Sequence, residues 1–351
     1  MALRVIQWAT GAMGKTCLRA IIDHPDLELV GLYVYSDAKA GLDAGDIARR
    51  GKTGVLATRD IDAILALDAD VVVHAARLAP PYGAHDEDIR RLLASGKNVI
   101  SINGYSDPAH WGGDRLAGFE AACARGGTSL MGAGLNPGFI AEKLAVVATS
   151  VCAQVEAIEV TEVVDCRAMR SPDYVFGVLG FGADPATLNP NDPDWGPASA
   201  LNGMYAEVLA AVAARLGWTL EAVETAHSVA PAGENLTVAA GHIARDMVAH
   251  LDWRWHGLVQ GRRALTMAIS WTMEPLAGDD PPLWTVRIEG TPGVRITVHL
   301  DKPLDDTVRT SAEQLGVAGA VVNAIPIVCA AAPGVVVSPI ATPFQAPQTS
   351  R

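Results

Sequence analysis

The chain has 351 residues, half of them hydrophobic, which is enough for two domains with a sizeable buried core. Its formal net charge of −12, without any block of like charges, disfavours nucleic acid and anionic membranes as partners. Five scattered cysteines argue against a disulfide framework or a metal cluster, and the absence of a signal peptide or a membrane-length apolar run predicts a cytoplasmic protein.

The first third of the chain alternates short apolar runs with helical patterns. Continuous apolar strands that alternate with helices are typical of a parallel sheet covered on both faces. The expected strands are Val5–Ala9, Leu29–Tyr35, Asp70–Ala75, Asn98–Ile102 and Thr128–Met131, and the expected helices include Leu18–Asp23, Glu87–Ser95 and Asp114–Arg125. The sequence therefore predicts an N-terminal α/β domain with a Rossmann-type parallel sheet.

The pattern changes near Asn136-Pro137-Gly138. Strands with interleaved polar residues follow, which predicts a largely antiparallel sheet with one packed face and one face free for a partner. The expected strands are Val155–Asp165, Leu236–Ala244, Ala264–Glu274, Leu283–Glu289 and Val294–Leu300. Helices are expected around Tyr174–Leu179, near Ala198–Leu216 and at Ser311–Ala332, the last one capped by Gly334, and a polar, frayed tail is expected from Pro343. The second part is therefore predicted to be an α+β domain.

A glycine-rich hexapeptide links the first strand to the first helix. Residues 9–14 read ATGAMG, the dinucleotide-binding fingerprint with Ala9 at its first glycine position. A glycine at position 11 lets the backbone approach a pyrophosphate, and one at position 14 lets the helix pack on the strand. The helix N-terminus supplies N–H groups to the phosphates. We therefore predict a nicotinamide dinucleotide site, the alternative being a structural turn, with these cofactor-binding residues: Gly11, Ala12, Met13 and Gly14.

The end of the second strand indicates which cofactor binds. An NAD site usually has an acidic residue there, whereas this strand ends in Tyr35 and Ser36, followed after Asp37 by Lys39. Ser36 can donate to a 2′-phosphate, Lys39 can neutralise it, and Tyr35 can stack on adenine. We therefore favour NADP, with NAD also possible, over the alternative of a solvated turn.

Two further turns follow parallel strands. Ligands bind beyond the carboxyl ends of such strands, so Ala75 and Ala76 are also predicted to contact the cofactor. The turn GAGLNPGF, residues 132–139, is expected to border the nicotinamide, because the Asn136 amide can both donate to and accept from a carboxamide. The alternative is an ordinary Asn-Pro-Gly turn.

These motifs, together with YSDAKAG and the late VNAIPIVCAAAPG stretch, resemble one family over essentially the whole chain. It comprises the dihydrodipicolinate reductase-like NAD(P)-dependent oxidoreductases, close to the native amine dehydrogenases and 2,4-diaminopentanoate dehydrogenase. The resemblance implies a Rossmann domain, a second domain whose sheet dimerises, and a last helix that returns to the first domain. It also implies that Asn323, like Asn136, lies near the nicotinamide. The expected domains are residues 1–135, 136–310 and 311–351.

One segment of this chain departs from the amine dehydrogenase pattern. After the fifth strand, the amine dehydrogenases carry a glutamate in a segment that resembles E-E-L-x-Y-P. Alignment on Pro108 puts Asn103 and Gly104 where the glutamates stand. A neutral amide cannot accept a proton, so we expect direct reduction to dominate over amination. Asn103 and Tyr105 are then candidates to bond or protonate a carbonyl oxygen.

Other acid–base candidates carry weaker signals. Tyr174 lies on an apolar helix and can reach a substrate, so it joins Asn103 and Tyr105 as a predicted catalytic residue. His74 is expected to be a satisfied core residue. The remaining candidates are Asp107 as a displaced acid, His110 as a cap or surface residue, and Asp165 and His242 on strands that can face the cleft.

The leading hypothesis is an NAD(P)H-dependent oxidoreductase that transfers hydride to or from a C=O or C=N carbon of a small to medium, largely apolar substrate. The alternatives are a native amine dehydrogenase that uses a non-glutamate acid, and an NADP-binding regulatory protein without turnover. The tryptophans of the second part, Trp271 and Trp284 among them, predict a core or dimer interface, and an apolar sheet face around them predicts a homodimer. Trp253 and Trp255 belong to the same group, which can alternatively line a substrate wall.

Overall fold

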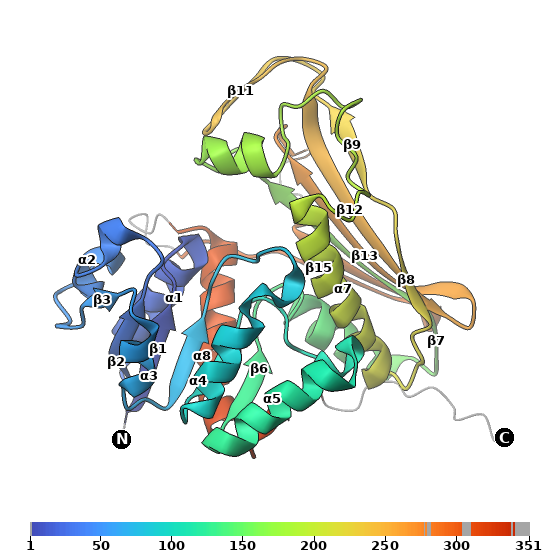
Figure 1. Ribbon diagram of the computed structural model, residues 1–351. Helices are drawn as coiled ribbons and strands as arrows, with labels where there is room; N and C mark the ends of the chain where they lie inside the picture. The colour runs from blue at the N-terminus through green and yellow to red at the C-terminus, as the bar shows by residue number, and fades with distance from the viewer. Residues whose placement is uncertain (1, 277, 279–281, 304–309, 338–339, 341–351) are drawn as a thin grey trace. The chain divides into compact units, whose positions relative to one another are not determined.

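The computed structural model describes residues 2–276, 278, 282–303, 310–337 and 340 (Figure 1). Within these residues the chain divides into two compact units. The first unit takes in residues 2–78, 84–139 and 300–337, and the second takes in residues 79–83 and 140–299. The expected frayed tail from Pro343 lies outside the described residues.

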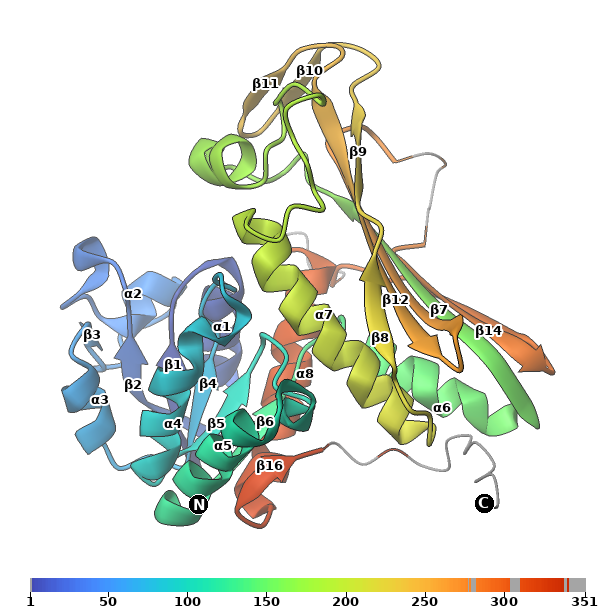
Figure 2. The ribbon, with the colours of Figure 1, turned by 45° about the vertical axis from the view of Figure 1, so that its right-hand side comes forward.

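A seven-stranded sheet forms the centre of the first unit, and every neighbouring pair in it is parallel. Its order is β16-β6-β5-β4-β1-β2-β3, which is the doubly wound nucleotide-binding order extended by β16 at the edge beside β6 (Figure 2). The strands are β1 (Leu3–Trp8), β2 (Leu27–Tyr33), β3 (Ala57–Thr58), β4 (Val71–His74), β5 (Asn98–Ser101), β6 (Ser129–Gly132) and β16 (Gly334–Val336). The predicted Rossmann sheet is confirmed.

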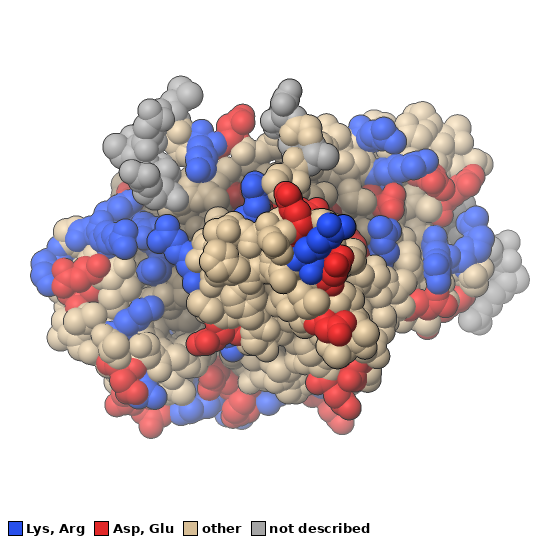
Figure 3. Space-filling view, turned by 90° about the horizontal axis from the view of Figure 1, so that it is seen from above, with Lys and Arg blue, Asp and Glu red and all other residues tan. Residues whose placement is uncertain are grey.

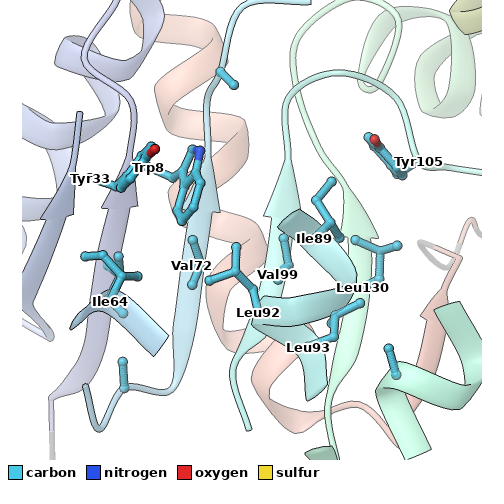
Figure 4. Packing of buried hydrophobic residues seen from close by; sticks show 14 of the residues in the cluster. Trp8, Tyr33, Ile64, Val72, Ile89, Leu92, Leu93, Val99, Tyr105 and Leu130 are labelled. Carbon is cyan, nitrogen blue, oxygen red and sulfur yellow. The ribbon is translucent and has the colours of Figure 1, made fainter. Parts of the chain in front are cut away.

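Helices cover both faces of this sheet because successive strand residues point to opposite sides. Val72 and Val99 pack with Leu92 in one cluster (Figure 4), whereas Val73 and Ile100 pack on the other face with Val321 and Ile325. The helices of the unit are α1 (Ala12–Asp23), α2 (Ala44–Ala48), α3 (Ile61–Ala66), α4 (Asp86–Ala94), α5 (Gly113–Gly126) and α8 (Ala312–Ala330), with short 3-10 turns at Asp37–Lys39, Tyr82–His85 and Pro108–Trp111.

Helix α8 bears on two expectations. By length and composition alone it could cross a membrane, although Gly316, Gly319 and Pro326 interrupt its apolar residues, as the sequence interpretation expected. The helix contacts β5 and β6, and Ala318, Val321 and Ile325 join the sheet core, which accounts for its apolar composition. It ends at the cap Ala331, while Gly334 begins β16 and is not the helix cap.

The second unit contains a largely antiparallel sheet, as predicted, in the order β15-β14-β7-β13-β12-β8, with β9 also paired to β12. Only the β13–β7 pair is parallel among these described strands. They are β7 (Gln154–Asp165), β8 (Ala222–Thr225), β9 (Ser228–Pro231), β12 (Val248–Val259), β13 (Arg262–Thr272), β14 (Trp284–Thr291) and β15 (Val294–Val298). The expected strand at 236–244 is instead a hairpin of β10 (Leu236–Val238) and β11 (Gly241–Ile243).

Helix α7 (Gly196–Arg215) packs on β12 and β13, and the π-helical turn Ile140–Ala145 packs on β14 and β7. Short helical segments lie at Val146–Ala148, Thr149–Val151 and, as a π-helical turn near the predicted helix, Asp173–Val178. Trp253 and Trp255 of β12 and Trp284 of β14 are at most 2% exposed.

The other face of this sheet is polar, contrary to the prediction of an apolar one. Alternation along the strands places Trp284 with the buried Val286 and Ile288, and leaves Thr285 and Arg287 on the opposite side. That side carries a hollow of about 310 Å³, lined by Glu159, Thr161, Pro282, Thr285, Arg287, Arg295 and Thr297. Trp253, Trp255 and Trp284 therefore belong to the core of the second unit. They do not make the opposite face of the sheet apolar.

Candidate cofactor site

The turn between β1 and α1 has the geometry of a dinucleotide-binding loop. Ala9 has a φ of 73°, a left-handed conformation in which glycine is normally preferred. A Cβ atom at Gly14 would lie 2.3 Å from the carbonyl oxygen of Ala9, so α1 approaches the turn closely enough to require glycine. The side chain of Gln7 supports the same turn, because its Nε2 donates to the carbonyl oxygens of Trp8 and Ala9 at 3.1 and 3.0 Å.

Gly11 has a different environment from Gly14. It caps the N-terminus of α1, and a Cβ atom built there would meet no atom within 4 Å. Ala12 is exposed beside it, and Met13 is half-buried. The helix N-terminus is thus open to solvent at Gly11 and Ala12, and its first N–H groups suit a pyrophosphate.

Lys39 is attached to this loop. Its Nζ donates to the carbonyl oxygen of Thr10 at 2.9 Å and to the Thr10 hydroxyl at 3.0 Å. Burial lowers the pKa of Lys39, and the nearby charge of Lys15 lowers it further. Lys39 therefore places a positive charge at the fingerprint loop and connects it to the segment that follows β2.

Tyr35 and Ser36 lie just beyond β2. The Tyr35 side chain is 48% exposed, and its hydroxyl accepts a 2.9 Å hydrogen bond from Nε1 of the buried Trp8. The Trp8 ring in turn stacks on Tyr33, with centroids 3.9 Å apart (Figure 4). Ser36 is exposed and its side chain makes no capping bond to the short helix that it precedes. A half-exposed aromatic ring and a hydroxyl thus lie where the adenosine half of a dinucleotide binds in this fold.

Arg59 is a further cation near this position, which the sequence interpretation does not include. It directly follows β3, and Thr58 pairs with Tyr33 of β2. Its Nη1 donates to the Asp37 carboxylate in an exposed ion pair. The two-residue strand β3 has no detectable periodicity in the sequence. The arginine that follows the Gly-Val-Leu-Ala run (residues 54–57) is the one sequence feature that indicates a cation at this position.

The turn after β4 is held by Asn103. The Asn103 Nδ2 donates to the carbonyl oxygen of Ala76 at 2.9 Å, and Asn103 is 7% exposed. Ala75 and Ala76 are themselves buried. The Asn103 amide is therefore engaged in positioning a predicted cofactor-binding turn.

Tyr105 lies inside the first unit. It is 1% exposed, has a φ of 63°, and its hydroxyl donates to the Asp86 carboxylate at 2.8 Å. Arg115 binds the same carboxylate at 2.5 and 2.7 Å. Figure 4 shows the ring near Ile89 and Leu130 of the sheet core. This geometry does not suit the predicted role of Tyr105 as proton donor to a substrate, because the phenol is enclosed and already donates to a carboxylate.

The remaining predicted residues of the first unit lie at a turn and on a helix. Asn136 is half-buried in the turn that follows β6, where the N–H of Phe139 donates to the carbonyl oxygen of Leu135 at 2.8 Å. A Cβ at Gly138 would lie 2.8 Å from the Gly134 nitrogen, so the turn is tightly folded. Asn323 is exposed on α8.

His74 ends β4 and is fully buried, as expected of a core residue. Its ring makes no hydrogen bond to another described residue, which corrects the expectation that it is satisfied. Burial lowers the pKa of His74 to about 3, and His85, whose ring centroid lies 5.1 Å away, adds to the effect. His74 is therefore neutral throughout the physiological range.

The other candidates are spread over both units. Tyr174 is half-buried at the π-helical turn of the second unit. In that unit Asp165 pairs with Arg167, and the His242 ring contacts the Thr237 hydroxyl at 3.2 Å. In the first unit, the exposed His110 packs edge-on against Trp111. No group of three or more metal-ligating side chains occurs among the described residues.

Comparison with known proteins gives a consistent assignment. The family model of dihydrodipicolinate reductase, N-terminus, matches residues 5–83. An amine dehydrogenase of Streptomyces virginiae is 27% identical over 356 aligned residues, covering 95% of this chain and 94% of the relative. A 4-hydroxy-tetrahydrodipicolinate reductase of Neisseria meningitidis serogroup B is 41% identical over 104 residues, which are 29% of this chain and 36% of that enzyme.

The fold is also that of a solved amine dehydrogenase. The structure from Mycobacterium smegmatis superposes with a TM-score of 0.77 at 20% identity, covering 96% of this chain and 95% of that one. The family match lies on β1 to β4 and includes the fingerprint turn, Lys39 and Arg59. Residues 5–83 therefore match the dihydrodipicolinate reductase N-terminus, and the chain as a whole is similar to amine dehydrogenases, which supports NAD(P)-dependent oxidoreduction.

Proposed function

We propose that this enzyme transfers hydride between NADP(H) and a C=O or C=N carbon of a small to medium, largely apolar substrate. The turn at residues 9–14 carries the proposal. At Gly14 the helix approaches the turn closely, and at Gly11 there is open space. Lys39, in the segment after β2, donates a hydrogen bond to the loop. These are the features that a pyrophosphate and its attached ribose require.

The residues of the first unit have separable tasks in this proposal. The nicotinamide supplies the hydride chemistry when it is bound. The N–H groups at Gly11, Ala12 and Met13 hold the pyrophosphate, Tyr35 and Ser36 contact the adenosine half, and Asn136 and Asn323 orient the carboxamide. Ala75 and Ala76 complete the site, and Asn103 positions their turn through its bond to Ala76.

The transferred proton needs a separate donor. Asn103 cannot change its protonation state, and Tyr105 donates to Asp86 inside the core. We therefore retain Tyr174 as the proposed donor and assign Asn103 and Tyr105 to positioning. Removal of the Tyr174 hydroxyl should then lower turnover by about 10²–10⁴-fold, the usual contribution of general acid–base catalysis.

Reductive amination is the second candidate, because an amine dehydrogenase aligns along 95% of the chain. Asn103 and Gly104 stand where the amine dehydrogenases carry glutamates, so another acid has to manage the ammonia in this case. Ammonium dependence separates the two candidates.

The assay uses NADPH oxidation with a panel of aldehydes and ketones, cyclohexanone among them, with and without ammonium. Turnover that ammonium leaves unchanged supports carbonyl reduction, whereas strong ammonium dependence selects amination. Gly11→Ala tests the cofactor site directly, because the new methyl group meets no protein atom but occupies the space assigned to pyrophosphate. It should weaken NADPH binding and leave the melting temperature unchanged. Gly51→Ala, an equally open and exposed glycine, is the matched control.

We also propose that the enzyme is a homodimer, as the family resemblance implies. The face available for pairing is polar, so the contact would rest on hydrogen bonds and ion pairs from residues such as Arg287 and Thr285. A single dimeric species in light scattering at micromolar concentration is the expected result, and a monomer contradicts the proposal.

A further inference from the structure

An exposed ion pair stands beside the predicted ribose site, and its two members act on a phosphate in opposite ways. Arg59 attracts a phosphate and Asp37 repels it. We propose that Arg59 is the residue that selects the 2′-phosphate of NADPH, and that Asp37 holds the guanidinium until that phosphate replaces it. This inference rests on the proposed NADP(H) site at the end of β2 and names the residue that determines its specificity.

Sheet register places Arg59 at this position. Thr58 pairs with Tyr33, and the N–H of Val34 donates to the carbonyl oxygen of Thr58 at 2.9 Å. Arg59, the residue after β3, therefore lies level with Val34, the residue after β2. Val34 stands two positions before Ser36. In this fold the group at the carboxyl end of β2 meets the 2′ position of the adenosine ribose. The guanidinium reaches the carboxylate of Asp37, the residue that directly follows Ser36 in the sequence.

Lys39 serves a different purpose from Arg59. Two of the three ammonium donors of Lys39 bind Thr10 of the fingerprint loop. Lys39 is thus committed to the side of the site where the pyrophosphate lies. Arg59 has a planar guanidinium, which binds phosphate through two parallel N–H groups, so it is the better match to a 2′-phosphate.

The exchange of partners is energetically easy. The side chain of Asp37 is 86% exposed and that of Arg59 is 48% exposed, and ion pairs in such settings contribute little to stability. A phosphate carries more negative charge than a carboxylate and offers three acceptor oxygens. Asp37 has solvent on most sides, so it can turn away when the phosphate arrives.

The surrounding surface favours an anion despite the net charge of −12. Figure 3, which looks down on the molecule of Figure 1 from above, shows Lys and Arg side chains over the part of the first unit that carries α2 and β3, with Asp and Glu side chains beside them. Cations held in exposed ion pairs of this kind remain within reach of an incoming phosphate.

Fragment binding tests the inference without turnover. Adenosine 2′,5′-bisphosphate and 5′-AMP differ only in the 2′-phosphate, and isothermal titration gives their dissociation constants with the full-length enzyme. Arg59→Ala should weaken the bisphosphate by about tenfold or more, the size of a lost charge-assisted contact, and leave 5′-AMP unchanged. Asp37→Asn should strengthen the bisphosphate, again without effect on 5′-AMP. Added salt should reduce the preference of the wild type.

Arg4→Ala is the matched control, because Arg4 on β1 forms a comparably exposed ion pair with Asp68 in the same unit. It should change neither dissociation constant. Equal losses for both ligands in Arg59→Ala, or no loss for either, would overturn the inference. A wild type that binds NADH and 5′-AMP but shows no gain from the 2′-phosphate overturns the inference and leaves dinucleotide binding intact. A wild type that binds neither NADPH nor NADH overturns the proposed function as well.

Discussion

The hydroxyl of Tyr82 donates a 2.6 Å hydrogen bond to the carboxylate of Glu207, and both residues are at most 4% exposed. Glu207 lies in the middle of α7, and Tyr82 lies on the short segment 79–83 between β4 and α4. That segment belongs to the second unit, although the strand before it and the helix after it belong to the first. The bond thus fastens the connection that follows the predicted cofactor turn at Ala75 and Ala76.

Removing this hydroxyl should destabilise the enzyme. Tyr82→Phe deletes a buried donor to a charged acceptor, and we expect the free energy of unfolding to fall by about 1–3 kcal/mol. Glu207→Gln keeps an acceptor of the same shape and should cost less. Urea unfolding followed by tryptophan fluorescence measures both. A Glu207→Gln loss larger than that of Tyr82→Phe would show that the hydroxyl is not the main partner.

Gly14→Ala should damage the fold as well as the site. The new Cβ would stand 2.3 Å from the oxygen and 2.8 Å from the carbon of the Ala9 carbonyl, and backbone must move to admit it. Overpacking of this kind costs about 1–3 kcal/mol. We expect a lower melting temperature and weaker NADPH binding, whereas Gly11→Ala should affect binding alone. Identical melting temperatures for both variants would contradict the close approach at Gly14.

The second unit should lose stability in mild acid through His227. Its ring lies 5.0 Å from both Trp253 and Trp255, its Nδ1 accepts from the N–H of Arg254 at 3.0 Å, and its Nε2 contacts the Asn202 Oδ1 at 2.9 Å. Burial lowers the pKa of His227 to about 4. The unfolded chain, with a pKa of about 6.5, therefore binds a proton first.

Stability tied to His227 is fully present above pH 6.5, falls as the pH drops towards 4, and reaches a loss of about 3 kcal/mol at most. His227→Gln should flatten the dependence of the unfolding free energy on pH over this window. A wild type equally stable at pH 7.5 and pH 4.5 would falsify this assignment. His74, whose pKa is also lowered by burial, adds a loss of the same sign in the first unit.

A pair of identical substitutions separates positioning from proton donation. Tyr105→Phe removes the bond to Asp86 and should lower the unfolding free energy by about 1–3 kcal/mol while changing kcat only slightly. Tyr174→Phe should reduce kcat by about 10²-fold or more. Steady-state kinetics and thermal melts on both variants give the answer. If Tyr105→Phe loses as much kcat as Tyr174→Phe, the assignment of Tyr105 to positioning is wrong.

The sequence alone determined the Rossmann sheet and the fingerprint turn, because both depend on local chemistry. Apolar runs of strand length appear as such in β1, β4 and β5, and the need for glycine at position 14 follows from the approach of one helix to one turn. Short or mixed elements carry weaker signals. β3 has two residues, and β12 is absent from the expected strands although its Leu251, Trp253 and Trp255 alternate with polar residues.

Tertiary structure decided what the polar side chains do, because their partners lie far away along the chain. Asn103 bonds to Ala76 and Tyr105 to Asp86, so two residues expected to be catalytic have partners within the scaffold. Arg59 meets Asp37 only because β3 pairs with β2. Packing of α7 against β12 and β13 likewise buries Trp253 and Trp255 in the core of the second unit. A strand sequence shows which residues share a face, whereas the elements packed against the sheet decide which face is buried.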